Sequence, residues 1–333
     1  MKKVAINGLG RIGRLLLRRY MQNSFSSFEL VAVNDPMPED NLEYLLKYDS
    51  VHGPSGLDIA FEPGMLIVDE TPLHLHHEKE PEKLPWKELD IDIVIECSGK
   101  FTKKTDATKH LQAGAVYVLI GAPSPDADIT LVLGVNENSF RPEKHRVISN
   151  ASCTTNSLAP VLKIMHECFG VEDALVTTVH AYTSSQSMVD VAAKKKIRGR
   201  AGAMNIIPTA TGADAAIVQV IPEMKDRIAA LAVRVPVADG SLSDISATLT
   251  KAVTVDELNS AFNAAAKNSL QGILAYTEEE LVSSDIIGNP HSSIIHALST
   301  KVVRDRHVKV QAWYDNEYGY ACRCLDLLET LPF

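Results

Sequence analysis

A glycine motif near the start of the chain constrains the fold more than any other feature. It runs from Gly8 to Gly13 in the pattern Gly-x-Gly-x-x-Gly, directly after the apolar run Val4–Ile6 and before helically spaced apolar residues from Ile12 to Met21. Glycines leave room for a pyrophosphate to approach the amides of a helix N-terminus, where the helix dipole favours anions. The motif predicts a dinucleotide-binding strand, turn and helix; a tight turn without a ligand is the alternative.

Two patterns of apolar residues divide the chain. Up to about residue 150, runs without polar alternation are typical of strands buried on both faces of a parallel sheet. These runs include Leu30–Val33, Ile91–Ile95, Val116–Ile120, Ile129–Leu133 and Val147–Ile148. From His307 to Tyr314 apolar and polar residues alternate, which indicates a sheet with one wet face. We predict an α/β Rossmann domain, then an α+β domain with a mostly antiparallel sheet.

Two helices are indicated in the second half of the chain. Thr254 and Glu257 have the spacing of a capping box, and an apolar stripe follows them. Residues 317–331 predict a last helix, in which Cys322 and Cys324 are expected to be buried.

Length, charge and cysteine content limit the class of protein. The 333 residues suffice for about two domains, and the formal net charge of −9 argues against a nucleic-acid binder as the primary role. Five cysteines are too few for a disulfide framework in 333 residues, and their number is odd, so we expect reduced thiols in the cytoplasm. We expect no signal peptide, because polar residues interrupt the first apolar run, and no membrane span.

Asp35 is the expected ribose ligand. It stands 27 residues after Gly8, at the end of the second predicted strand, where a carboxylate accepts hydrogen bonds from the adenosine ribose. A carboxylate there repels a 2′-phosphate, so NAD is favoured over NADP. The alternative is a cap or turn residue before Pro36.

Cys153 is the candidate nucleophile. It follows Ser152, a plausible N-cap, so we expect its thiol at the positive end of a helix, which would lower its pKa toward neutrality. His180 ends the apolar run Ala174–Val179 and is the candidate base; a structural histidine is the alternative.

Two other clusters are assigned less specific roles. His74, His76 and His77 resemble zinc ligands, but alternate residues of a strand place only two on one face and no cysteine is near, so we expect a polar strand edge and no metal site. The simplest interpretation of the basic run 194–200 is a surface exposed to solvent. Together with Arg234, the run would also provide a positive field that attracts an anionic substrate.

Several segments together resemble the phosphorylating glyceraldehyde-3-phosphate dehydrogenase family. The resemblance covers essentially the whole chain and is carried by the segments AINGLGRIGR, LLKYDSVHG, NASCTTN, HAYTSSQ, NIIPTATGA, RVPV, GNPHSSI and WYDNEYGY. It implies oxidation of glyceraldehyde 3-phosphate by NAD and inorganic phosphate to 1,3-bisphosphoglycerate in glycolysis, through a hemithioacetal and a thioester on Cys153. It also implies a homotetramer, an NAD-binding domain of residues 1–152 completed by helix 317–333, and a catalytic domain of residues 153–316.

The resemblance also implies roles for individual residues. Cys153 would be the nucleophile and His180 the base. The residues implied for the cofactor are Gly8, Gly10, Arg11, Ile12, Gly13, Asp35, Gly121 and Asn316, the last directed at the nicotinamide amide. Those implied for the substrate and inorganic phosphate are Ser152, Thr154, Thr183, Arg198, Thr211, Gly212 and Arg234.

Four positions depart from the family pattern. Ser157 replaces a second cysteine, Gly121 replaces a hydroxyl residue of the cofactor pocket, and Lys79 replaces an arginine beside the adenine. The basic loop is one residue shorter than usual, so Arg198 is assigned to phosphate with Arg200 as the alternate. Erythrose-4-phosphate dehydrogenase is the competing function, but that enzyme lacks the HAYT segment present here at residues 180–183.

Overall fold

The computed structural model covers residues 1–333 and contains two compact units. The first unit is Met1–Ser152 together with Ala321–Phe333, and the second is Cys153–Tyr320. None of the helices combines the length and the apolar character that crossing a membrane requires.

A nine-stranded sheet forms the centre of the first unit. Its order is β3-β4-β5-β2-β1-β6-β7-β9-β8, and only the β3–β4 and β4–β5 pairs are antiparallel. The strands are β1 (Lys2–Asn7), β2 (Phe28–Asn34), β3 (Ile59–Glu62), β4 (Met65–Val68), β5 (Thr71–His76), β6 (Ile93–Glu96), β7 (Tyr117–Ile120), β8 (Ile129–Thr130) and β9 (Val147–Ser149). The predicted α/β fold with a parallel sheet is confirmed.

Two details of this sheet differ from the predictions. Strand β8 is shorter than the predicted 129–133, because the Asn136 side chain binds the Thr130 carbonyl and the Val132 amide and ends the ladder. The expected polar strand edge at the histidines is wrong, because β5 pairs with both β4 and β2 inside the sheet.

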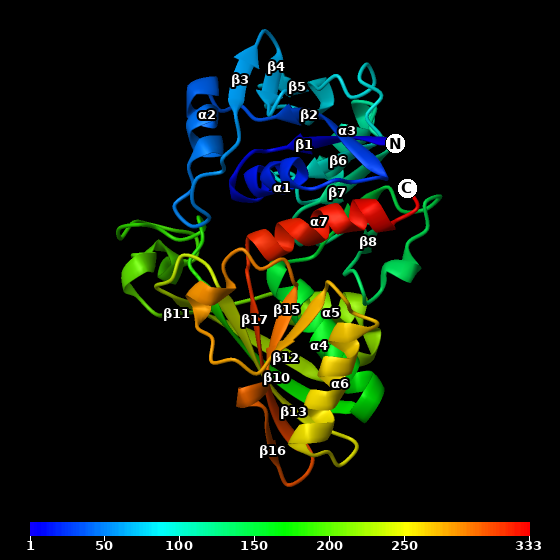
Figure 1. The fold of residues 1–333 in the computed structure, drawn as a ribbon, viewed down its shortest axis with the longest axis vertical. Helices are drawn as coiled ribbons and strands as arrows, with labels where there is room; N and C mark the ends of the chain where they lie inside the picture. The colour runs from blue at the N-terminus through cyan, green and yellow to red at the C-terminus, as the bar shows by residue number, and fades with distance from the viewer. The chain divides into compact units, whose positions relative to one another are not determined.

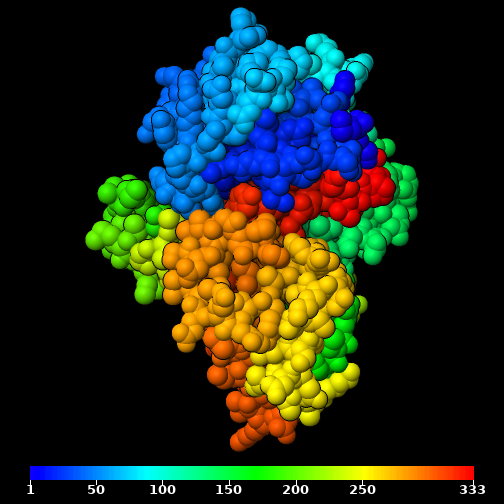
Figure 2. All heavy atoms as spheres, in the orientation of Figure 1, coloured from blue at the N-terminus to red at the C-terminus, as the bar shows by residue number.

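The helices of the first unit bury apolar faces. They are α1 (Arg11–Gln22), α2 (Glu39–Lys47) and α3 (Lys104–Gln112), with part of α7 (Tyr318–Thr330). In α1 the consecutive residues Leu15, Leu16 and Leu17 are buried, and in α7 both cysteines are buried as predicted. Figure 2 shows the C-terminal residues, in red, against the N-terminal residues, in blue. Within the first unit, Glu329 accepts hydrogen bonds from Ser26 and Ser27.

The second unit contains a mixed sheet in which most pairs are antiparallel, as predicted. The order is β11-β12-β10-β13-β17-β15-β14, with β16 paired to β17. The strands are β10 (Val171–Ala181), β11 (Ile207–Ala210), β12 (Ile228–Val235), β13 (Ser241–Leu249), β14 (Leu274–Thr277), β15 (Ser293–His296), β16 (Lys301–Val303) and β17 (His307–Tyr314).

Three helices accompany this second sheet (Figure 1). They are α4 (Cys153–Phe169), α5 (Ala213–Val220) and α6 (Val255–Lys267). Helix α4 is almost entirely buried along its first three turns. The predicted capping box of α6 is confirmed: the Thr254 hydroxyl accepts from the Glu257 amide, and the Glu257 carboxylate accepts from the Thr254 amide.

The short helical turns are 3₁₀ helices. They are η1 (Pro81–Lys83), η2 (Glu137–Ser139), η3 (Lys196–Gly199), η4 (Gly202–Met204), η5 (Pro222–Met224), η6 (Ser283–Ile286) and η7 (Ala297–Ser299).

Candidate active site

The glycine turn of the first unit is shaped by close backbone contacts. Gly8 has a φ of +96°, and a Cβ there would lie 2.5 Å from the Ser98 amide nitrogen. A Cβ on Gly13 would lie 1.9 Å from the Gly8 carbonyl oxygen, so neither position accepts a side chain. Around Gly10 nothing lies within 4 Å of such a Cβ, and this glycine faces a hollow of about 180 Å³.

The hollow lies where strands β1, β2 and β6 end. Its lining residues are Asn7, Gly8, Gly10, Asn34, Asp35, Pro36, Glu78, Lys79, Cys97, Ser98, Lys100 and Phe101. Asp35 accepts from the Leu9 amide at 2.6 Å and from the Met37 amide at 2.9 Å, which fixes its carboxylate at the rim. Because each carboxylate oxygen has two lone pairs, Asp35 retains acceptor capacity for ribose hydroxyls. The turn and the carboxylate therefore fit a dinucleotide.

Arg11 and Ile12 open helix α1 beside this hollow. The Arg11 guanidinium pairs with the Asp49 carboxylate at 2.5 Å. Burial raises the pKa of Asp49, but hydrogen bonds from the His52 and Val51 amides and from Arg11 outweigh burial and lower the pKa to about 2. The Arg11 side chain thus holds the loop after α2.

Gly121 has a structural reason to lack a side chain. An ideal Cβ on Gly121 would lie 2.8 Å from the Cys97 thiol sulfur, closer than the two atoms can approach. Cys97 itself lines the hollow. The Cys97 thiol therefore occupies the space that a side chain at position 121 would need. The sequence alone did not show this relation.

A buried polar network lies beneath the hollow and was missed by the sequence analysis. The Glu96 carboxylate accepts hydrogen bonds from the Asn7 amide, from the His110 ring at 3.0 Å and from both the amide and the hydroxyl of Ser98. Asn34 in turn donates to Asn7 at 2.6 Å. The ends of β1, β2 and β6 are thereby tied together.

In the second unit, the candidate nucleophile and base lie side by side. Cys153 is the first residue of α4, which places Ser152 at the N-cap position, and Ala151 before it has a φ of +53°. The Cys153 sulfur lies 3.5 Å from Nε2 of His180, which β10 supplies near its end. His180 Nδ1 lies 2.7 Å from the Ala181 carbonyl oxygen. Since a carbonyl only accepts, Nδ1 carries the hydrogen, and Nε2 is the basic nitrogen facing sulfur.

Both partners are held in their neutral forms. Burial and the nearby Arg234 lower the pKa of His180 to about 3. Burial raises the pKa of Cys153 to about 11, although Arg234 and hydrogen bonding to Thr154 lower it. The expectation of a lowered thiol pKa is therefore wrong: it counted the helix N-terminus but not the desolvation of the sulfur, which has the larger effect.

Tyr314, which the sequence analysis did not identify, anchors the start of α4. Its hydroxyl lies 3.0 Å from that of Thr154 and 2.8 Å from that of Thr178 on β10. The Tyr314 ring also packs edge-on against the His180 ring, with centroids 6.0 Å apart. The tyrosine therefore connects the strand of the base to the helix of the nucleophile.

The two candidate arginines of the basic run have different partners. Arg198 donates to the hydroxyls of Thr209 and Ser185, each at 3.3 Å, and its charge is close enough to lower the pKa of His180. Arg200 instead pairs with Asp190 at 2.6 Å with its side chain largely exposed. Of these two arginines, Arg198 is therefore the one whose charge reaches His180, whereas Arg200 is held by Asp190.

Arg234 supplies a cation near the base, and Thr211 and Gly212 stand at the start of a helix. Arg234 donates to the Ala181 carbonyl at 3.0 Å and to the Thr183 hydroxyl at 3.2 Å. Thr211 and Gly212 precede α5, and the Thr211 hydroxyl accepts from the Ala213 amide at 3.2 Å. Cationic side chains, hydroxyls and a helix N-terminus are the groups that bind phosphates.

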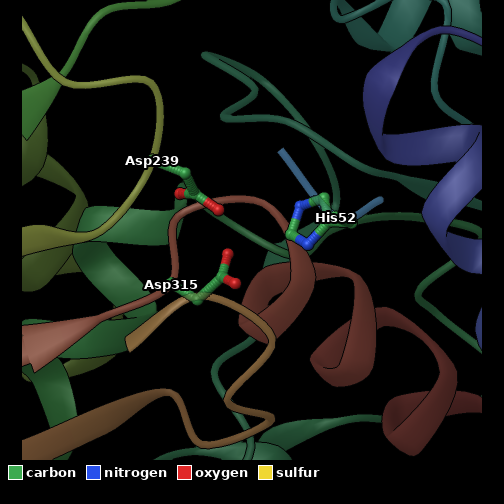
Figure 3. Close-up of side chains that lie close together, drawn as sticks. All are labelled: His52, Asp239 and Asp315. Atoms are coloured by element: carbon green, nitrogen blue, oxygen red, sulfur yellow. The ribbon is translucent and has the colours of Figure 1, made fainter. Parts of the chain in front are cut away.

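Asn316 lies on a firmly anchored loop after β17. Its Oδ1 accepts a 2.5 Å hydrogen bond from the Ser241 hydroxyl, and the preceding Asp315 accepts from the amides of Gly288, Glu317 and Tyr318. Figure 3 shows the carboxyl groups of Asp239 and Asp315 facing one another. Burial and the neighbouring Asp315 raise the pKa of Asp239 well above its ordinary range.

Comparison with known proteins matches both parts of the chain to one family. The family model described as glyceraldehyde 3-phosphate dehydrogenase, NAD binding domain, matches residues 2–104, and the C-terminal domain model of the same enzyme matches residues 152–316. The chain is 49% identical to the glyceraldehyde-3-phosphate dehydrogenase of Geobacillus stearothermophilus, over 98% of this chain and 96% of the relative.

Two further relatives give the same result. The chain is 49% identical to the glyceraldehyde-3-phosphate dehydrogenase of Chlamydia pneumoniae, over 98% of both chains. It is 48% identical to glyceraldehyde-3-phosphate dehydrogenase 2 of Bacillus subtilis strain 168, over 98% of this chain and 95% of the relative.

Proposed function

The chain belongs to the glyceraldehyde-3-phosphate dehydrogenase family, and from this premise we propose how its own residues carry out the reaction. The family activity is that of an NAD-dependent oxidoreductase, which converts glyceraldehyde 3-phosphate and inorganic phosphate into 1,3-bisphosphoglycerate. The observation that carries the proposal is the 3.5 Å contact between the Cys153 sulfur and the unprotonated Nε2 of His180.

The first step is a proton transfer coupled to attack. His180 Nε2 takes the thiol proton as the Cys153 sulfur adds to the aldehyde carbon. The imidazolium then gives this proton to the former carbonyl oxygen, which completes the hemithioacetal and leaves Nε2 free to accept again. Neither group is ionised beforehand, because burial disfavours a lone thiolate and a lone imidazolium alike. Transfer within the pair creates the two charges together, 3.5 Å apart, so each stabilises the other.

The second step oxidises the bound carbon. NAD supplies the acceptor for the hydride that leaves this carbon. The chain's part is to remove the hydroxyl proton at His180 and to keep the product as a thioester on Cys153. We assign the cofactor to Gly8, Gly10, Arg11, Ile12, Gly13, Asp35 and Gly121 of the domain formed by residues 1–152 and helix 317–333, and its nicotinamide amide to Asn316.

The third step transfers the acyl group to inorganic phosphate. A phosphate oxygen attacks the thioester carbon, the bond from that carbon to the Cys153 sulfur breaks, and the sulfur recovers the proton held by His180. We assign the two anion positions to Arg198, Arg234, Thr183, Ser152, Thr154, Thr211 and Gly212 of the catalytic domain, residues 153–316. The pairing of Arg234 with Thr183 supports this assignment, and the pairing of Arg200 with Asp190 favours Arg198 over Arg200. The backbone amide of Cys153 and the His180 imidazole stabilise the oxyanion that develops.

The proposed assembly is a homotetramer. Large apolar side chains that a single chain leaves exposed support self-association, because such surfaces mark interaction sites. They cluster in the segment 182–206, green in Figure 2, where Met188 and Met204 are 80% and 82% exposed. The reducing cytoplasm remains the proposed location, which the five free thiols support.

The absorbance of NADH tests the reaction path. Enzyme is mixed with NAD and glyceraldehyde 3-phosphate, first without and then with inorganic phosphate. We expect one rapid equivalent of NADH per Cys153 without phosphate, because the thioester accumulates, and continuous formation once phosphate is added. Continuous turnover without phosphate would show hydrolysis of the thioester and contradict the proposed phosphate sites.

A further inference from the structure

Ser241 is a fully buried serine at the first position of β13, and its hydroxyl touches two groups of the site. It accepts from the Ala181 amide at 3.1 Å and donates to Asn316 Oδ1 at 2.5 Å. The residue was not among those implied by the sequence, because its neighbours come from β10 and from the loop after β17.

The end of a strand ladder explains the first contact. Pairing between β10 and β13 runs as far as Val179 with Leu242. Ala181 lies beyond this last pair, so its amide takes the Ser241 side chain as acceptor instead. The Ala181 carbonyl in turn accepts from His180 Nδ1 at 2.7 Å and from Arg234 at 3.0 Å. Ser241 thus holds the residue that orients the base.

The second contact uses the single hydrogen of the hydroxyl. A serine hydroxyl has one donor and two acceptor positions. The Ala181 amide occupies one acceptor position, and the hydrogen is directed at Asn316 Oδ1, 2.5 Å away. The NH₂ group of Asn316 therefore points away from Ser241. In this orientation the Asn316 side chain can donate a hydrogen bond to the carbonyl oxygen of a ligand carboxamide, but it cannot accept one from the NH₂ group of that carboxamide.

We propose that Ser241 is a positioning residue that links His180 to Asn316, and that it fixes which face of the Asn316 amide meets the nicotinamide carboxamide. This rests on the proposed assignment of Asn316 to the nicotinamide. Without the hydroxyl, the Asn316 amide can rotate so that its oxygen and nitrogen exchange places. The rotated amide would lose its hydrogen bond to the carboxamide carbonyl, and the nicotinamide ring would be held less firmly.

Ser241→Ala in the full chain tests the proposal with two ligands. NAD contains the nicotinamide, whereas ADP-ribose lacks it and uses only the hollow of the first unit. We expect about a tenfold higher Kd for NAD, the size of one hydrogen bond, an unchanged Kd for ADP-ribose, and a kcat lower by about tenfold or more. Ser241→Cys, which keeps a weak donor in nearly the same volume, should fall between the two proteins.

Ser243→Ala is a matched control. Ser243 lies two residues along β13 on the same face, is equally buried, and its hydroxyl has no hydrogen-bond partner. We expect this variant to bind NAD and turn over as the unaltered protein does. Equal losses in both serine variants would show a general packing effect and overturn the proposal, as would an unchanged Ser241→Ala protein or an equal loss of ADP-ribose binding.

Asn316→Ala separates this proposal from the proposed function. If Asn316→Ala weakens NAD binding and adding Ser241→Ala weakens it no further, the two residues act as one unit. If Asn316→Ala weakens NAD binding but Ser241→Ala does not, the proposed cofactor contact stands and the role of Ser241 is wrong. If Asn316→Ala leaves NAD binding unchanged, the assignment of Asn316 fails and the positioning role fails with it.

Discussion

The two units differ in how they hold their buried ionisable groups. Beneath the hollow of the first unit, the Glu96 carboxylate receives four hydrogen bonds and Asp35 receives two backbone amides. Around the thiol of the second unit, burial keeps Cys153 and His180 neutral. These carboxylates accept hydrogen bonds from backbone amides and side chains, and so hold the strand ends and the glycine turn in place. The neutral thiol carries a proton, and Nε2 of the neutral imidazole can accept it. Nucleophilic attack by the sulfur requires this transfer.

Cys153→Ser removes the reactive sulfur of the second unit, leaves the hollow of the first unit unchanged, and should have the largest effect. A serine hydroxyl is a far weaker nucleophile, so we expect NADH formation to fall by about 1000-fold or more, with NAD binding retained. Steady-state absorbance and an NAD titration measure both. Cys168→Ser is the control, because Cys168 lies on the same helix but is exposed. An active Cys153→Ser protein would remove the sulfur from the mechanism.

His180→Asn removes the proton acceptor and leaves the sulfur. We expect kcat to fall by about 100- to 10,000-fold, the usual contribution of a general base. The variant must form its thiolate by losing the proton to solvent, and burial sets that pKa at about 11, so its rate should rise steadily with pH up to that value. A variant rate with no pH dependence above neutrality would contradict this. His307→Asn, at an exposed position, should behave as the unaltered protein.

Sequence reasoning succeeded where one short segment contains the whole feature. The turn Gly8–Gly13 and the capping box of α6 each depend on residues close together in the chain, so spacing predicts them. The contacts of Ser241, of Tyr314 and of the Glu96 network depend on which strands become neighbours. The periodicity of a short segment does not predict strand order. The thiol pKa was misjudged for the same reason. Adjacent residues predict the helix N-terminus, whereas the burial of the sulfur depends on how the folded chain packs.

Gly121→Ala tests whether the first unit is as tightly fixed as its hydrogen bonds indicate. The added Cβ would lie 2.8 Å from the Cys97 sulfur, so we expect a loss of about 1–3 kcal/mol of unfolding free energy. Cys97→Ala in the same chain opens that space, and the double variant should recover most of the loss. Urea unfolding of the four proteins measures the coupling; additive effects would show that the two residues do not compete for space.

Asp35→Ala removes a ligand-facing carboxylate and tests cofactor choice. We expect NAD affinity to fall by about tenfold, the size of one charged hydrogen bond, while NADP loses less because the repulsion of its 2′-phosphate disappears as well. Equal losses for the two cofactors would show that the ribose contact is absent. Asp40→Ala, at an exposed position on α2, is the matched control and should change neither affinity.

Asp49→Asn should have the smallest effect and concerns stability alone. The pKa of Asp49 lies near 2 in the folded chain, against an ordinary value of 3.8, so the unfolded chain binds a proton in the interval between them and the folded chain does not. The carboxylate therefore stabilises the fold fully above pH 4, and this stabilisation is lost as the pH falls toward 2. Because Arg11 is one-third exposed, solvent screening limits the gain to about 1 kcal/mol. Urea midpoints of the two proteins should differ at pH 7, differ less at pH 3, and converge only below pH 2. A difference that persists below pH 2 would mean that the hydrogen bonds to the His52 and Val51 amides, which an asparagine oxygen only partly replaces, outweigh the ion pair with Arg11.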